Sequence, residues 1–418
     1  MPSRWATVLL VLLLALGFYL PTSIAEAISV KLYLASAVML GGILLALLLR
    51  KRGVLSVMAV VNVAAINVIM LVCTLFSPLT AFAYGGYVPI LLFSILFCVN
   101  LKGIELTMTV RRAFDVANAI NLLLAVLLML QVPVITDFFL NYYAYGYDEL
   151  VPYMLEEGKP VLTFGSHSLA GFFFYLLFYL TLQAFITFRS KLNLLYACCY
   201  LALLVSLSSF TALVFAGVAV VQLVLCFRGH RSAIAGLVTA GVLLTAAAVA
   251  IPRIDAFANT QEDLLEVLQR EDNGLLGRYS GTGGLSANLE YIADHPFSPI
   301  GLGMSWQLWY SDSGPVEYVL KGSFPLLLTV YAGAFLFFQK NLRSRRRALF
   351  LFFVFLGFEV GYSNLQYLRT QFFLPFLLVY LNGLDKAGES ACPTSLKRPH
   401  GVGQALSPVF LTPIESHA

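Results

Sequence analysis

The stretch SHSLAGFFFYLLFYLTLQAFITF, from Ser166 to Phe188, decides the fold of this chain. It contains no Asp, Glu, Lys or Arg, and a helix of about 20 apolar residues is enough to cross the hydrocarbon core of a bilayer. A helix satisfies its own backbone hydrogen bonds, so it is the form in which such a run is stable in lipid. The stretch therefore predicts a membrane-spanning helix over residues 161–188.

Similar apolar runs fill most of the 418 residues, of which 59% are hydrophobic and 11% charged. Soluble domains carry about 25% charged residues. We expect an all-α polytopic integral membrane protein with about 12 transmembrane helices. They cover residues 5–21, 29–49, 54–76, 82–101, 114–134, 161–188, 192–207, 210–227, 232–251, 322–338, 348–362 and 366–383. The division at SLSSF (206–210) matters most, because one long tilted helix there would invert everything downstream.

Most of the 26 basic residues fall in the turns on one side of this arrangement. Positive charge is retained on the cytoplasmic side of a membrane, so we place both termini in the cytoplasm. The net charge of +4 is small and its basic residues are scattered, which excludes a nucleic-acid partner. We expect the first helix to be retained, although AEA (25–27) is also compatible with signal-peptide cleavage.

Two external loops are long, and long connections are usually functional. We divide the chain into an N-terminal five-helix membrane region (1–134), a first external loop (135–160), central membrane helices (161–251), a large external loop (252–321), C-terminal membrane helices (322–383) and a disordered cytoplasmic tail (384–418). Within the large loop, TQEDLLEVLQRED (260–272) and SANLEYIADH (286–295) predict two short amphipathic helices. Pro296 is expected to end the second one.

Arg278 lies in LLGRYSGTGG (275–284), among several glycines. A glycine-rich backbone leaves amide groups free for an anion, and arginine presents a planar fork to phosphate oxygens. A solvated arginine in a loose loop explains the same pattern. Lys159 lies at the expected outer end of helix 161–188, where a lysine is electrostatically unfavourable unless an anion is near. Alternatively, its side chain extends to the membrane interface. His167 is expected two turns deeper, as an interior histidine or as a base.

Asp312 and Glu317 are the carboxylates nearest the expected membrane surface before the tenth helix. A half-buried carboxylate can deprotonate a hydroxyl, whereas Asp312 is also typical of a turn. Arg369 begins the last expected helix. It should face the protein interior, a partner or water, because an unpaired charge inside the bilayer costs about 3 kcal/mol or more. Glu359, deep within a helix, is a candidate by the same rule, or else pairs with a neighbouring helix.

Four segments together resemble the O-antigen polymerase and O-antigen ligase superfamily. GRYSGTGGLSANLEYIADHPFSPIGLG (277–303) resembles its external loop, and DSGPVEYVLKGSFPLLLTVY (312–331) resembles the element that follows. KPVLTFGSHSLAGFFFYLL (159–177) and LVSLSSFTALVFAGVAVVQLVL (204–225) resemble an earlier loop-to-helix junction and a Ser-rich helix pair. The resemblance covers residues 159–383 and implies a GT-C-like membrane fold.

The resemblance implies a membrane glycosyltransferase that needs no metal or cofactor. A sugar hydroxyl attacks a glycan on undecaprenyl diphosphate, and fixed cations stabilise the departing diphosphate. Arg278 is the first choice for this role, and Asp312 or His167 is the base. The diphosphate or glycan site is expected to include Lys159, Arg369, Arg253 and His295. The stretch HPFSPIGLG (295–303) is expected to act as a hinge that shapes the site, with little chemistry from its own side chains.

The resemblance favours a polymerase of lipid-linked repeat units for O-antigen or exopolysaccharide in the bacterial inner membrane. Its partners are the lipid-linked donor and acceptor and the bilayer, with a chain-length regulator and a flippase as candidates. The alternatives are a ligase that transfers the glycan to another acceptor, or a glycolipid transporter. The family usually has arginine at the position of Lys159, and its ligases carry His-Asn where this chain has Asp312 and Ser313, which counts against a ligase.

Overall fold

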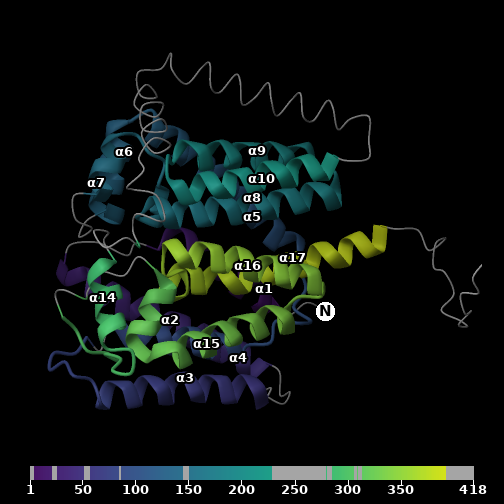
Figure 1. The fold of residues 1–418 in the computed structure, drawn as a ribbon. Helices are drawn as coiled ribbons and strands as arrows, with labels where there is room; N and C mark the ends of the chain where they lie inside the picture. The colour runs from purple at the N-terminus through teal and green to yellow at the C-terminus, as the bar shows by residue number, and fades with distance from the viewer. Residues whose placement is uncertain are drawn as a thin grey trace, which may run out of the picture.

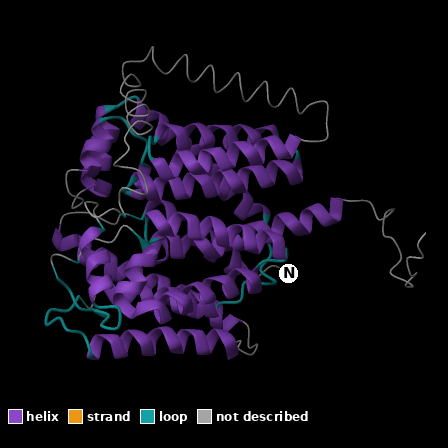
Figure 2. Ribbon diagram, in the orientation of Figure 1, coloured by secondary structure: helices purple, strands orange, loops and turns teal. Residues whose placement is uncertain are grey.

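The computed structural model describes residues 4–20, 26–50, 57–83, 86–144, 150–227, 279, 285–305, 308 and 313–391. Within these ranges the ordered elements are helices, and the only strand-like feature is an isolated bridge between Phe82 and Gly303 (Figure 2). The helices are α1 (Arg4–Tyr19), α2 (Glu26–Arg50), α3 (Val57–Leu75), α4 (Tyr87–Cys98), α5 (Met108–Met129), α6 (Pro133–Phe139), η2 (Leu140–Ala144), α7 (Leu150–Glu156), η3 (Leu162–Phe164), α8 (His167–Phe188), α9 (Lys191–Ser206), α10 (Phe210–Phe227), α14 (Ser286–Asp294), α15 (Gly314–Asn341), α16 (Arg345–Gly361), η5 (Asn364–Gln366) and α17 (Leu368–Ala391). The predicted all-α class is confirmed for this part of the chain.

Five segments are long and apolar enough to cross a membrane: Lys31–Leu49 within α2, and the helices α3, α5, α8 and α15. The helices α1, α4, α9 and α10 are apolar but shorter. These properties support the expected helical membrane protein. The expected span 232–251 and the expected helix at 260–272 lie outside the described residues.

The long helices lie side by side, with many of the loops gathered at one end (Figures 1 and 2). α8, α15 and α17 begin at this end, which we call the loop end. α1 begins and α17 finishes at the opposite end, which we call the terminal end (Figure 1). The two ends of the described chain therefore lie on one side of the bundle, as the charge pattern requires.

Helix α8, which holds the stretch quoted first after its capping residue Ser166, is the most enclosed of the five long apolar segments. Its apolar window is 89% buried, compared with 22% for that of α3. A helix that is apolar on every face is expected to be enclosed. The ring of Phe172 lies 5.0 Å from Phe358 of α16, and that of Phe173 lies 5.4 Å from Phe373 of α17. The helices α9, α10, α16 and α17 therefore pack against α8.

The break at SLSSF is confirmed, because α9 ends at Ser206 and α10 begins at Phe210. Ser208 adopts a φ of 49°, a left-handed conformation that a continuous helix does not contain. The Ser209 side chain then accepts a hydrogen bond from Ala212 N–H at 3.3 Å and caps the new helix. Two helices therefore occupy this region in place of one long tilted helix.

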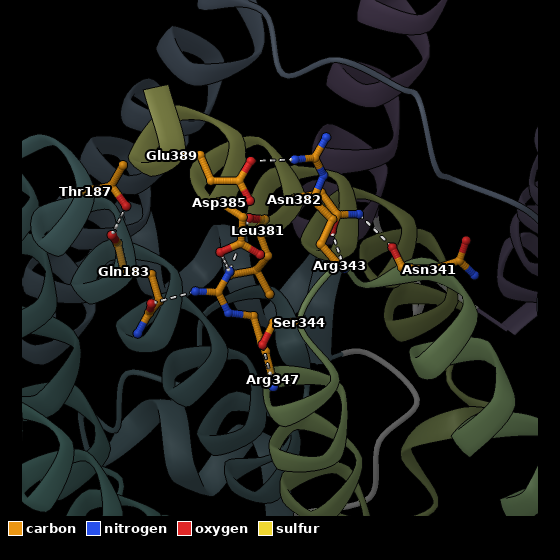
Figure 3. Close-up of polar contacts among 10 residues, drawn as sticks. All are labelled: Gln183, Thr187, Asn341, Arg343, Ser344, Arg347, Leu381, Asn382, Asp385 and Glu389. Carbon is orange, nitrogen blue, oxygen red and sulfur yellow. Dashed lines mark hydrogen bonds and ion pairs between the residues drawn. The ribbon is translucent and has the colours of Figure 1, made fainter. Parts of the chain in front are cut away.

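Arg347, in the first turn of α16, joins three helices at the terminal end (Figure 3). Its guanidinium contacts Asp385 Oδ1 of α17 at 2.6 Å and donates to Gln183 Oε1 of α8 at 3.0 Å. Beside it, Asn382 Nδ2 donates to the carbonyl of Asn341 at 2.6 Å and ties α17 to the end of α15. Part of the basic cluster that predicts the cytoplasmic side is therefore structural.

Candidate functional site

Four of the seven candidate residues lie in the described part of the chain: Lys159, His167, His295 and Arg369. Arg278, Asp312 and Arg253 lie outside it. The four described residues belong to segments at the loop end: the α7–α8 connection, the start of α8, the end of α14 and the start of α17. The sequence did not predict the short helices α6 and α7 in the first external loop.

Lys159 was expected at the outer end of the membrane helix, but it does not lie there. The short helix η3 separates it from α8. Its ammonium lies 2.9 Å from Glu157 Oε2, and both side chains are mostly buried. Its backbone N–H donates to Met154 O at 2.9 Å, which fixes the turn after α7. The anion expected near this lysine is therefore the carboxylate of Glu157.

His167 is the first residue of α8 and does not lie two turns inside it, which corrects the expected depth. The helix starts late because Gly165 has a φ of 77° and Ser166 caps it, with its side chain accepting from Leu169 N–H at 3.2 Å. The imidazole is half-buried. His167 is therefore placed near the loop end, at the level expected for a surface site.

Arg369 faces the protein interior, one of the three environments expected for it, and its side chain is completely buried. Its guanidinium donates to the carbonyl of Leu20, just after α1, and lies 5.5 Å from the ring of Tyr143. The Tyr143 hydroxyl in turn donates to Tyr19 O at 2.7 Å. These contacts join α17, α1 and η2, so in this conformation Arg369 is a structural link rather than an accessible anion site.

The stretch HPFSPIGLG follows α14, the predicted amphipathic helix. His295 is exposed, and its ring stacks on Tyr291 at 4.7 Å. Further along, Leu302 N–H donates to Thr74 Oγ1 of α3 at 3.1 Å, and Met304 N–H donates to Ala81 O at 2.8 Å. The segment 300–304 is therefore bonded to the end of α3 and to the α3–α4 connection, and we call it the brace.

The brace also fills a gap in α15. This helix is broken at Gly322 and Ser323, and Pro325 follows. Proline has no N–H, so the carbonyl four residues earlier loses its helical partner. Ile300 N–H donates to Leu320 O at 2.9 Å and Gly301 N–H donates to Lys321 O at 3.0 Å. The brace thus satisfies carbonyls that the break releases, and it holds α15 against α3.

The first turns of α15 meet η5 in a group of polar side chains, Glu317, Lys321, Ser363 and Gln366, which we call the α15–η5 cluster. Lys321 Nζ forms an ion pair with Glu317 Oε1 and lies 3.3 Å from Gln366 Oε1. Ser363 donates to Glu317 Oε2 at 2.6 Å. The sequence did not reveal this group, because the helix was expected to begin only at residue 322; α15 begins at Gly314, and helix geometry brings residues 317 and 321 together.

Glu359 lies behind this cluster and is completely buried. Its Oε1 accepts from Leu365 N–H at 2.7 Å, while Oε2 lacks a hydrogen-bond partner among the described residues. Oε2 packs directly on Gly314 at the start of α15, where any Cβ would collide with it. The positive end of a helix favours a carboxylate. Glu359 is therefore held between the start of α15 and η5.

Tyr279 anchors the glycine-rich segment to this end of the bundle. Its Oη lies 2.6 Å from Ser313 Oγ and donates to Val360 O at 2.8 Å. In the sequence, Tyr279 follows Arg278 directly and Ser313 follows Asp312. The side-chain contact therefore joins the chain neighbours of the two leading candidate residues.

At the loop end, Lys159 and Lys321 are each paired with a carboxylate, Glu157 and Glu317 respectively. An anionic ligand would have to displace Glu157 or Glu317 to bind them. The described residues include no group of three or more His, Cys, Asp or Glu side chains that could hold a metal ion.

Comparisons with protein-family models, with curated proteins and with solved structures find no match for this chain.

Proposed function

We propose that this protein is a membrane glycosyltransferase that polymerises oligosaccharide repeat units carried on undecaprenyl diphosphate. The proposal rests on the sequence resemblance and on a helical bundle in which the four described candidate residues belong to segments at the loop end. In this proposal the loop end faces the outside of the bacterial inner membrane and both termini are cytoplasmic.

The contact between Tyr279 and Ser313 is the observation that carries the proposal. It supports a site in which Arg278 and Asp312, one residue before each of them, act together. Arg278 would stabilise the charge that grows on the departing diphosphate. Asp312, or His167 at the start of α8, would accept the proton of the attacking sugar hydroxyl. The new bond joins that hydroxyl oxygen to the anomeric carbon as the bond to the diphosphate breaks.

The position of the buried charges favours an enzyme over a transporter. Among the described residues, Glu359 and Arg369 are the completely buried charged side chains. Glu359 lies two residues before the end of α16, and Arg369 is the second residue of α17. A transporter is expected to place such groups near the middle of the membrane.

The test is to delete the gene and analyse the glycans that remain attached to the lipid carrier. A single accumulated repeat unit supports the polymerase. Long lipid-linked polymer would indicate a ligase, and units held on the cytoplasmic leaflet would indicate transport; either result contradicts the proposal.

Complementation then tests the site. Arg278→Ala is expected to abolish chain growth with normal protein level, whereas Arg270→Ala, in the same loop, serves as the matched control. Tyr279→Phe, which removes only the hydroxyl that contacts Ser313, is expected to lower the rate. Near-normal polymer with Arg278→Ala would remove this arginine from the site.

A further inference from the structure

A groove opens between α3 and α4 near the loop end. Its volume is about 380 Å³, which lies in the range of roughly 300–1,000 Å³ that is usual for small-molecule sites. Its long wall is formed by α3 from Asn67 to Thr74, and Tyr87 of α4 and Leu302 of the brace complete it. At 1.5 Å per residue, this wall is on the order of 10 Å long.

The few polar groups of the groove already bond to one another or to the backbone. The Tyr87 hydroxyl donates to Asn67 Oδ1, and Asn67 Nδ2 donates to Val63 O at 2.7 Å. Thr74 Oγ1 donates to Met70 O at 2.7 Å and accepts from Leu302 N–H. The remaining surface is carbon, so the groove fits an apolar occupant.

The position of the groove determines what kind of apolar occupant is available. α3 is long enough to cross a membrane, yet only 22% of its apolar window is buried by the protein. Val68 and Leu71, which line the groove, are 57% and 60% exposed. Helix surfaces of this kind face hydrocarbon in a bilayer. A chain of a membrane lipid is therefore the molecule that can fill the groove.

The end of the groove is connected to the α15–η5 cluster. Leu302 lines the groove, and the preceding residue, Gly301, donates to the carbonyl of Lys321, whose ammonium belongs to that cluster. On the other side, Gln371 of α17 donates to Pro89 O of α4 at 3.0 Å, which holds α4 beside η5. A lipid with its chain in the groove would place its head near the polar groups of the loop end.

We propose that this groove binds the isoprenoid tail of the lipid-linked substrate, in the part nearest the head group. This inference rests on the proposed function, because that function supplies the isoprenoid lipid. It adds the position of the tail, with the brace as the boundary between the groove and the loop end.

The test uses a photoreactive polyprenyl diphosphate and the full-length protein in membranes. The label is expected on the α3 peptide that contains residues 67–74, and unlabelled polyprenyl diphosphate should compete for it. Leu71→Trp fills the groove and should lower labelling by about tenfold or more. Val61→Trp, on the exposed face of the same helix outside the groove, is the matched control and should keep it.

A second variant, Leu71→Ala, enlarges the groove and should also keep the label, which separates blocking from misfolding. Label elsewhere, equal label in both tryptophan variants, or competition by phospholipid instead of polyprenyl diphosphate would overturn the inference. The labelling does not require turnover. Competed label in the groove without any glycan polymerase activity would therefore contradict the proposed function alone.

Discussion

Replacing Gly301 by alanine tests whether the brace holds α3 against α15. Gly301 has a φ of 59°, a left-handed conformation. A Cβ atom at this position would lie 2.5 Å from Thr74 Cα and 2.7 Å from the carbonyl carbon of Cys73. Both are backbone atoms of α3, which cannot turn aside as a side chain can. The alanine variant must therefore move the brace away from α3.

The cost can be estimated from the structure. The left-handed conformation costs an alanine about 1–2 kcal/mol. Displacement of the brace breaks the bonds from Gly301 N–H to Lys321 O and from Leu302 N–H to Thr74 Oγ1, each with a net value of about 0.5–1.5 kcal/mol. We therefore expect Gly301→Ala to lower the free energy of unfolding by about 2–5 kcal/mol.

Two measurements check this expectation in purified protein. Denaturant unfolding gives the loss of stability, and thiol labelling reports the local movement. Cys73 is half-buried beside the brace, so in a variant that keeps it as the sole cysteine, its labelling should become faster.

Gly86→Ala is the control, because Gly86 lies in the same region, has a negative φ, and a Cβ there meets nothing within 4 Å. If Gly301→Ala matched both this control and the parent protein in stability and in labelling of Cys73, the brace would not have the role described here.

Three further outcomes follow from the buried contacts. Gly314→Ala should destabilise the protein, and combining it with Glu359→Ala should recover about 0.5–3 kcal/mol in a double-mutant cycle; additive effects would mean that the two do not collide. Glu359→Gln should leave or raise the free energy of unfolding, since a neutral amide of the same shape avoids burying a carboxylate, and a clear loss of stability would contradict this. Arg347→Met, which leaves a carboxylate and an amide without their partner, should cost about 1–3 kcal/mol, whereas Arg345→Met, at an exposed position, should change little; equal effects would show that the three-helix contact is dispensable.

The apolar runs predicted the helices well because hydropathy and length are local properties. The polar break at SLSSF and the helix α14 were located correctly for the same reason, since Ser206 and Pro296 limit their helices locally. α5 was expected to begin at residue 114, but it begins at Met108 because Thr107 caps it and accepts from Val110 N–H.

Contacts between distant segments could not be predicted. Nothing in HPFSPIGLG shows that its backbone N–H groups meet carbonyls of α15, because those carbonyls are free only once Pro325 breaks the helix. The partner of Lys159 was also hidden, although Glu157 is two residues away, because no local pattern in the first external loop predicts α7 or the turn that follows it. The interior position of Arg369 is one of the three environments expected for it, because the cost of a charge in lipid leaves only the interior, a partner or water.

The break at Gly322 and Ser323 divides α15 into two helical segments with different hydrogen-bond partners. The portion after Pro325 belongs to a helix that is long and apolar enough to cross a membrane. Gly314–Lys321 carries Glu317 and Lys321, and its last carbonyls accept hydrogen bonds from Ile300 and Gly301 in a different segment. The direction of Gly314–Lys321 is therefore set by the segment 300–304, and the helix after Pro325 does not continue into it.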